Sequence, residues 1–379
     1  MIADRRLLVS PVPRLLFFSL FPASHTPSSR NRLPRFPVGY SGFTRKSQPT
    51  AMRDVIIIGA GPVGLACAIE AKRRNLDALV IDKGALCNSL IGYPTEMEFF
   101  STPELLEIGG YPFATNRYKP FREEALDYYR RVAVAEALDL RLYEPVEDLR
   151  GADGDFTVVT AKAAYRTRKV VLATGFFDVP NRLGVPGEDL DKVTHYFKEP
   201  YPYALQKVAV IGGANSAAKA ALACYRNDAE VTLVVREAAV SEKVKYWIKP
   251  DLENRIKEGS IRAFFNTTVR AITEDALVLD TPEGTTEIAN DWVLAMTGYR
   301  PDFDFLARFG VAFRDDDART PVYDEDGTFE TNNPGVYLAG TVAGGLNTSR
   351  WFIENGRFHA ERIMEDVAKR LGEAASLAK

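Results

Sequence analysis

The chain has 379 residues, enough for two or three domains, and its hydrophobic fraction of 46% is typical of a globular protein. The formal net charge is −3, but residues 1–51 hold eight of the 48 basic residues and one of the 51 acidic ones, so the remainder is acidic. An acidic body argues against nucleic acid as a partner, and no apolar run reaches membrane-spanning length. The three cysteines form no C-x-x-C pair and no metal-like cluster, which predicts a reducing, intracellular setting and no metal site.

Residues 1–51 differ in composition from the rest, with seven Ser, seven Pro, seven Arg and no Glu. A transit peptide, a disordered arm and an upstream extension of the reading frame that is not made in the cell are the three interpretations. Met52 stands just before the first expected strand, where a natural start would fall. We therefore favour the extension and begin the fold prediction at residue 52.

The β-branched apolar run 55–58 leads directly into the G-x-G-x-x-G motif Gly59-Ala60-Gly61-Pro62-Val63-Gly64. This order predicts a buried parallel strand, a tight turn at Gly59, and a backbone at Gly61 that a pyrophosphate can approach. Gly64 lets the following helix, expected over 65–74, pack close to the strand. The free N–H groups at its N-terminus favour a phosphate.

A second expected strand, 78–81, ends at Asp82, 18 residues after Gly64. An acid at this spacing accepts hydrogen bonds from ribose hydroxyls. The following segment, which includes Lys83, Asn88 and Ser89, is expected to wrap the nucleotide, and a loop packed for stability is the alternative. Helices are expected to begin near Thr102 and to span 122–139.

Turn signals then separate a series of short strands that leads to a turn of small residues. The expected strands are 142–146, 156–161, 164–166 and 169–172. The last one enters Ala173-Thr174-Gly175, where small side chains let the backbone lie close to a ligand.

The same order then recurs. The apolar run 208–211 enters a second loop, Gly212-Gly213-Ala214-Asn215-Ser216-Ala217, followed by an expected helix over 217–225 and a strand over 231–235. That strand ends at Arg236 instead of an acid, and an arginine favours a 2′-phosphate. Lys243 and Lys245 are expected to add to the same pocket.

Meander strands are expected at 261–272, 276–280 and 286–289, followed by the run 292–298. The stretch 335–341, with Gly340 and Thr341, then reads as the closing piece of the first unit. The fold class is therefore α/β, with two Rossmann-like, three-layer dinucleotide-binding domains, the second inserted into the first, each with a β-meander. Two such domains in one chain suggest a flavin and a nicotinamide acting in series.

Several further stretches resemble the thioredoxin-reductase-like flavoproteins, and within them the bacillithiol-disulfide reductases (the YpdA family). These stretches are Asn88-Ser89, Tyr93-Pro94-Thr95, 99–102 (FFST), 194–200 (THYFKEP), 245–251 (KYWIKPD), 343–345 (AGG) and 353–357 (IENGR). The resemblance covers essentially 52–379.

The resemblance implies FAD in the outer domain, NADPH in the inserted one, a small-molecule disulfide as substrate and a homodimer or higher homo-oligomer. The expected boundaries are 52–195 for the first part of the FAD domain, 196–298 for the NADPH domain and 299–379 for the second part of the FAD domain. A role in cytoplasmic thiol redox balance follows from the same likeness.

The chain differs from the flavoproteins that it resembles at several positions. It lacks the C-x-x-C of thioredoxin reductases, and Val63 stands where bacillithiol-disulfide reductases often have a cysteine. Cys67, four residues on along the same helix face, is the candidate replacement, and Cys87 a weaker one. Buried packing is the alternative for both. Thr341 stands where many FAD proteins have Asp.

His195 is the candidate proton donor to a leaving thiolate, with a structural hydrogen bond as its alternative. A ferredoxin- or flavodoxin-NADP reductase fits the same layout without any cysteine. A redox sensor that binds both nucleotides with little turnover belongs to a different class, and a flavin monooxygenase fits less well because its linker motif is absent.

Overall fold

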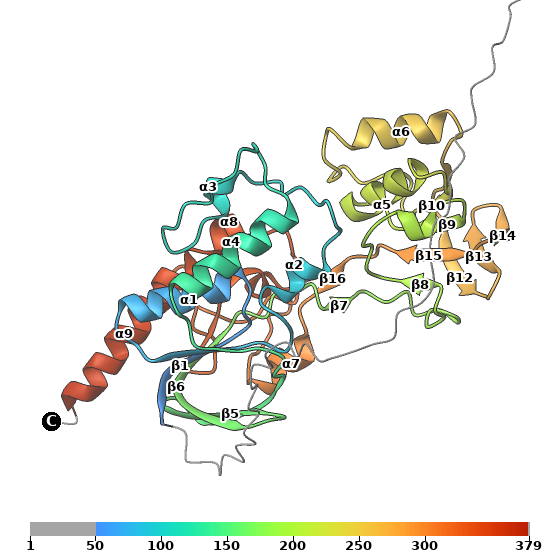
Figure 1. The fold of residues 1–379 in the computed structure, drawn as a ribbon. Helices are drawn as coiled ribbons and strands as arrows, with labels where there is room; N and C mark the ends of the chain where they lie inside the picture. The colour runs from blue at the N-terminus through green and yellow to red at the C-terminus, as the bar shows by residue number, and fades with distance from the viewer. Residues whose placement is uncertain (1–50, 378–379) are drawn as a thin grey trace, which may run out of the picture. The chain divides into compact units, whose positions relative to one another are not determined.

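The computed structural model describes residues 51–377, so the expectations for residues 1–50 lie outside the described range. Within that range, no helix combines the length and the apolar character needed to cross a membrane. The described residues form two regions, each built around a β-sheet (Figure 1).

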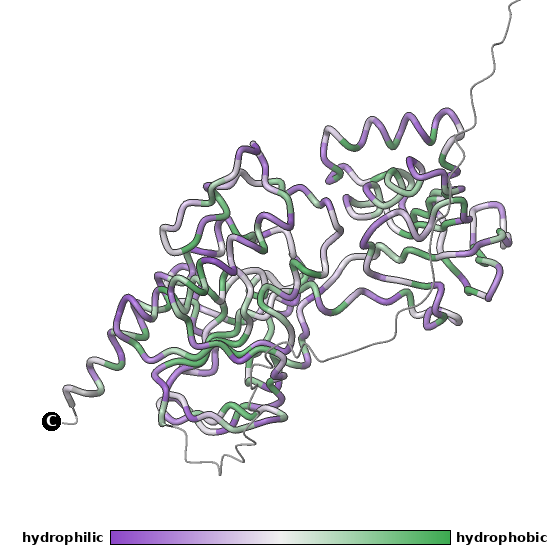
Figure 2. The backbone as a smooth tube through the Cα atoms, viewed as in Figure 1, coloured by the Kyte–Doolittle hydropathy of each residue, from purple (hydrophilic) through white to green (hydrophobic). Residues whose placement is uncertain are grey.

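The first region is built on a seven-stranded sheet in the order β3-β2-β1-β6-β5-β4, with β17 also paired to β6. Ile56 of β1 pairs in parallel with Leu79 of β2 on one side and with Val170 of β6 on the other. The central strands are continuous hydrophobic segments (Figure 2) because they are covered on both faces. The strands are β1 (Arg53–Ile58), β2 (Ala78–Ile81), β3 (Leu140–Arg141), β4 (Val146–Ala152), β5 (Asp155–Thr160), β6 (Ala164–Leu172) and β17 (Val336–Leu338).

Helix α1 (Pro62–Arg73) packs on β1 and β2, and α9 (His359–Leu377) packs on α1. The sequence predicted a helix beginning at Leu65, but α1 begins at Pro62. Proline suits the first helical position because its φ is already helical and it has no N–H that needs a partner. Helix α4 (Arg122–Ala135) ends four residues before the expected 139.

The second region has a parallel five-stranded sheet in the order β11-β10-β9-β15-β8 and a separate three-stranded meander, β12-β13-β14. The expected single strand 261–272 is wrong: it divides into β11, which extends the parallel sheet, and β12, which opens the meander. Helix α5 (Asn215–Tyr225) packs on β9 and β10, and α6 (Lys249–Lys257) packs on α5. The strands are β8 (Val193–Thr194), β9 (Lys207–Ile211), β10 (Glu230–Val234), β11 (Arg262–Phe264), β12 (Thr268–Ile272), β13 (Ala276–Thr281), β14 (Gly284–Ala289) and β15 (Trp292–Ala295).

The second region is inserted between β6 and β17 of the first sheet. The outgoing strand β7 (Val179–Pro180) and the returning strand β16 (Tyr299–Arg300) pair with each other in antiparallel fashion. Because β8 belongs to the second sheet, the expected boundary between residues 195 and 196 falls just after a strand of that sheet.

Short elements complete the connections. They are α2 (Asn88–Gly92), α3 (Pro103–Leu106), η1 (Tyr201–Tyr203), α7 (Phe303–Arg308), η2 (Gly340–Gly344) and α8 (Ile353–Gly356).

Candidate functional site

The first phosphate loop lies in a cavity at the carboxyl end of β1. Gly59 has φ +115°, and a Cβ there would lie 2.4 Å from the Ala173 carbonyl oxygen. A Cβ on Gly64 would lie 1.9 Å from the Gly59 carbonyl oxygen, whereas one on Gly61 would meet no atom within 4 Å. The backbone is therefore packed tightly at Gly59 and Gly64 and left open at Gly61, as the approach of a phosphate requires.

Asp82 organises the wall of this cavity. One carboxylate oxygen accepts from the Ala60 N–H at 2.7 Å, and the other accepts from the Gly84 N–H at 2.8 Å. Burial raises the pKa of the carboxyl group, although the hydrogen bonds from Ala60 and Gly84 oppose the shift. Each carboxylate oxygen keeps a further lone pair, so the group remains able to accept from a ribose hydroxyl.

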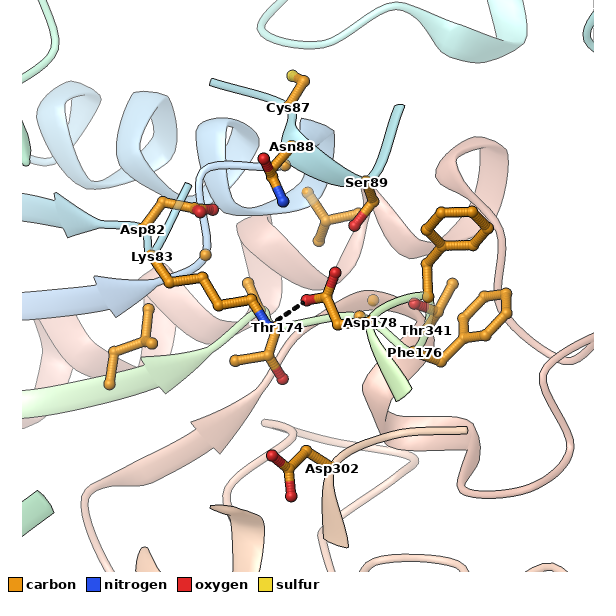
Figure 3. Close-up of a pocket in the computed structure, with 18 of the residues that line it drawn as sticks. Asp82, Lys83, Cys87, Asn88, Ser89, Thr174, Phe176, Asp178, Asp302 and Thr341 are labelled. Carbon is orange, nitrogen blue, oxygen red and sulfur yellow. Dashed lines mark ion pairs between the residues drawn. The ribbon is translucent and has the colours of Figure 1, made fainter. Parts of the chain in front are cut away.

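The cavity brings together most of the site residues predicted for the first domain (Figure 3). The predicted residues that line it are Gly59, Gly61, Pro62, Val63, Asp82, Lys83, Asn88, Ser89, Thr174, Gly175, Gly340 and Thr341. Gly64 does not line it but packs behind the loop. A Cβ on Gly175 would lie 3.6 Å from Thr341 Oγ1, so the turns that follow β6 and β17 lie side by side.

The sequence prediction missed several lining residues. They are Tyr93, Pro145, Phe176, Phe177, Asp178, Arg300, Asp302, Phe305, Arg308 and Ile353. Lys83 Nζ and Asp178 Oδ2, 2.9 Å apart, form an ion pair that joins the segment after β2 to the segment after β6 (Figure 3). Residues 176–178 follow the Ala173-Thr174-Gly175 turn directly, and this position in the sequence could have indicated that they line the cavity. No pattern marks Arg300 or Arg308, because they reach the cavity from the returning connection and from α7.

The second phosphate loop is arranged differently. Asn215, the first residue of α5, donates to the Lys243 carbonyl at 2.9 Å and accepts from the Lys245 N–H at 3.0 Å. These bonds hold the segment with both lysines against the N-terminus of α5. Ala214 and Ser216 are exposed, so the loop faces solvent.

Arg236, two residues after the end of β10, extends into solvent with its side chain 81% exposed. Its Nε lies 2.6 Å from Glu237 Oε1. The Gly213 carbonyl accepts from the Ser241 N–H at 2.9 Å, which places the segment after Arg236 against the phosphate loop. The segment after Arg236 and the segment that contains Lys245 thus both lie against the second phosphate loop.

The three cysteines are free thiols and all are buried. Cys67 and Cys87 are 0% and 1% exposed, and burial raises the pKa of each thiol well above its ordinary value. In Figure 3 the side chain of Cys87 points away from the middle of the cavity. Burial also raises the pKa of Cys224, to about 12.

Val63 lines the cavity, and its side chain packs on glycines. A Cβ on Gly340 would lie 3.1 Å from Val63 Cγ2, and one on Gly356 would lie 3.6 Å from the same atom. Val63 therefore fills the space between α1, η2 and α8.

His195 lies in the second region and does not line the first cavity. Its Nε2 is 3.1 Å from Glu188 Oε1, and burial lowers the pKa of the imidazole although Glu188 opposes the shift. Glu188 also accepts from the N–H groups of Leu183 and Gly184. Within residues 51–377 neither ring nitrogen of His195 has a hydrogen-bond partner, so both the proton-donor role and the structural hydrogen bond of His195 stay predictions.

The pattern of the pyridine nucleotide-disulphide oxidoreductase family matches residues 56–340, and the chain belongs to that family. Over 317 residues it is 45% identical to a protein named bacilliredoxin reductase Bdr from Bacillus subtilis, covering 83% of this chain and 97% of that protein. Solved structures of bacillithiol disulfide reductase Bdr from Bacillus cereus and Staphylococcus aureus superpose with TM-scores of 0.82 and 0.81 at 42% and 39% identity. Each comparison covers 84% of this chain and 99% of the solved one.

The protein is thus an oxidoreductase with two Rossmann-like nucleotide domains that uses FAD and a nicotinamide dinucleotide. The first cavity fits the flavin nucleotide because it combines an open approach at Gly61 with the carboxylate of Asp82. The second loop fits the nicotinamide nucleotide, with the N-terminus of α5 free for a pyrophosphate.

Proposed function

We propose that the protein oxidises NADPH and reduces a low-molecular-weight disulfide of the bacillithiol type without a cysteine of its own as carrier. The observation that carries the substrate class is the likeness, over nearly the whole length of each, to reductases named for bacilliredoxin and for bacillithiol disulfide. Bound FAD would supply the two-electron chemistry: it would accept a hydride from the reduced nicotinamide and pass an electron pair to the disulfide, which two protons would convert into two thiols.

The chain's own residues bind and orient the two nucleotides. In this proposal Asp82 accepts from the flavin nucleotide's ribose, the loop 59–64 receives its pyrophosphate, and the backbone and hydroxyl of Thr341 stand in for the usual carboxylate. Arg236 and Lys245 receive the 2′-phosphate of NADPH.

The burial of the cysteines supports a direct transfer from the flavin. A thiolate is the reactive form of cysteine, and burial disfavours it at Cys67, Cys87 and Cys224. This geometry favours the packing alternative for Cys67 over the thiol role predicted from the sequence.

The experiment is anaerobic NADPH oxidation by the purified protein, before and after bacillithiol disulfide is added, for the wild type and for Cys67→Ala, Cys87→Ala and Cys224→Ala combined. We expect the disulfide to accelerate oxidation and the triple variant to keep kcat/KM within about threefold of wild type. A loss of about a hundredfold or more in a folded, FAD-loaded triple variant would contradict the thiol-free route.

A second acceptor follows from the name of the Bacillus subtilis relative. Bacilliredoxin carrying a mixed disulfide is compared with the free disulfide under the same conditions. Faster turnover with bacilliredoxin than with the free disulfide would indicate that the substrate is a protein disulfide. If both disulfides fail while NADPH still reduces the flavin, the ferredoxin- or flavodoxin-reductase alternative becomes the better assignment.

We further propose a cytoplasmic homodimer or higher homo-oligomer. The three unpaired thiols support a reducing compartment. Light scattering coupled to size-exclusion chromatography tests the assembly, and a monomeric mass at micromolar concentration would contradict it.

A further inference from the structure

The turn after β17 depends on a side chain for one of its backbone hydrogen bonds. Ala339 still donates to the Leu172 carbonyl of β6, at 2.9 Å, but the next amide, that of Gly340, has left the sheet. The Gly340 N–H instead donates to Nδ1 of His359 at 3.1 Å, and both groups are buried. An amide buried without a partner is destabilising, so His359 completes a turn that the sheet leaves unfinished.

His359 is held rigidly at the beginning of α9. Its ring is 2% exposed, stacks on Phe329 with ring centroids 3.9 Å apart, and meets the edge of Trp351 at 4.4 Å. Among residues 51–377, no group forms a hydrogen bond with Nε2. A half-turn of the imidazole would put Cδ2 in the place of Nδ1 and break the bond to Gly340.

The chemistry of this bond fixes the form of the imidazole. Nδ1 accepts a hydrogen bond from the Gly340 N–H, so Nδ1 carries no proton of its own. The ring proton of the neutral imidazole therefore resides on Nε2. Burial, with a smaller contribution from Arg362, lowers the pKa of His359 to about 3. The ring is thus a neutral acceptor throughout the physiological pH range.

The turn held by His359 is part of the flavin cavity. Gly340 and Thr341 both line it, and Gly340 has φ +79°. A Cβ on Gly340 would lie 3.1 Å from Val63 Cγ2, and one on Gly356 would lie 3.2 Å from Gly340 Cα. The turn is therefore packed between α1 and α8, and a change in the direction of the Gly340 amide would move Thr341.

We infer that His359 is a positioning residue for the flavin: through Nδ1 it fixes the Gly340–Thr341 turn in the orientation that receives the cofactor. The inference rests on flavin binding by the first domain and not on the electron acceptor. Its test contains no disulfide, so its failure leaves the proposed substrate untouched.

The test compares two amide side chains that differ in reach. In His359→Asn, Oδ1 takes the place of Nδ1, whereas in His359→Gln the acceptor lies one bond further out. We expect His359→Asn to keep the FAD Kd within about threefold of wild type and His359→Gln to weaken it by about tenfold or more. The Kd is measured by quenching of flavin fluorescence as the apoprotein is titrated.

Phe329→Leu is the packing control. It removes the stacked ring but not the acceptor, so we expect a lower Tm of the apoprotein with the FAD Kd within about threefold of wild type. The inference is overturned if His359→Gln binds FAD like the wild type, if the Asn and Gln variants are equally weakened, or if Phe329→Leu weakens FAD as much as His359→Gln.

Hydrogen–deuterium exchange provides a second measurement if His359→Gln does not fold. In His359→Asn we expect the peptide containing Gly340 to keep its wild-type protection. Exchange faster by about tenfold in a folded His359→Asn protein would overturn the inference.

Discussion

The two phosphate loops share a strand, a glycine turn and a helix, but they differ in how the rest of the chain encloses them. The first loop forms one wall of a cavity, with Asp82 bonded to its backbone and the Lys83–Asp178 ion pair beside it. The second loop faces solvent, and its basic side chain Arg236 is 81% exposed.

This difference matches the duties of the two nucleotides. A cofactor that stays bound through many turnovers gains from burial and from preformed hydrogen bonds. A nicotinamide that arrives reduced and leaves oxidised in each cycle needs an open site with charges that attract it. With the proposed assignment of the two nucleotides, the same local motif would retain a cofactor in one place and exchange one in the other.

The largest effect is expected at the close contact between strand and helix. Gly64→Ala would place a Cβ 1.9 Å from the Gly59 carbonyl oxygen, and we expect it to lower the free energy of unfolding by about 3 kcal/mol or more and to abolish FAD binding. Ala217 occupies the matching position in the second loop, where a Cβ already fits. Ala217→Gly should cost only about 1 kcal/mol. Equal losses in urea unfolding would show that the two loops are packed alike.

Gly61→Ala separates binding from folding within the first loop. A Cβ there meets no protein atom within 4 Å, so the apoprotein should keep its stability within about 0.5 kcal/mol. The methyl group stands where the pyrophosphate approaches, and the FAD Kd should rise by about tenfold or more. An unchanged FAD Kd in Gly61→Ala would contradict the proposal that the pyrophosphate lies against Gly61.

The acids beside the two loops are expected to act in opposite directions. Asp82→Asn replaces an oxygen acceptor with a donor next to the Ala60 or Gly84 amide, and we expect the FAD Kd to rise by about tenfold. Glu237→Gln removes the negative partner of Arg236 and should leave the KM for NADPH unchanged or lower it. A higher KM for NADPH in Glu237→Gln would indicate that Glu237 itself contacts the nucleotide.

Arg236→Ala sharpens the assignment of the second loop. We expect the KM for NADPH to rise by about tenfold while the KM for NADH stays within about twofold, because only NADPH carries the 2′-phosphate. Steady-state kinetics with both nucleotides measures the ratio. A similar rise in the KM for NADPH and for NADH would contradict the proposal that Arg236 binds the 2′-phosphate.

The smallest effect concerns pH and the turn at Gly340. The pKa of His359 is about 3 in the folded protein and about 6.5 when unfolded, so the unfolded state binds more protons between these values. The stability that neutral His359 contributes is complete above the unfolded pKa and is lost as the pH falls. Between pH 6.5 and 5.5 the wild type should lose about 1 kcal/mol more than His359→Asn in urea unfolding. Parallel pH curves for the two proteins would contradict a neutral His359.

Much of this architecture was predictable because local patterns specify it. The runs 55–58, 78–81 and 208–211 became β1, β2 and β9, and the repeated strand–loop–helix order correctly indicated two Rossmann-like domains. The inserted arrangement followed from the order of the motifs along the chain. Strand pairing was less accessible: β11 joins a parallel sheet through contacts with β10 that no short-range pattern encodes.

The candidate site divides in the same way. Gly59, Gly61 and Asp82 were predicted and line the cavity, because one motif contains the residues that a dinucleotide requires. Arg300 and Arg308 were missed because they reach the cavity from distant connections. Nothing in the sequence indicated a role for His359, because its hydrogen bond to the Gly340 amide joins residues 19 positions apart.

The sequence by itself determined the two nucleotide-binding turns and their order, because glycine spacing and β-branched runs act over a few residues. Only the tertiary structure decided which side chains are buried and which are exposed. Cys67 stands near the first phosphate loop in the sequence, yet packing leaves it 0% exposed with a raised pKa. Burial depends on every element that packs around a side chain, and that information is spread over the whole chain.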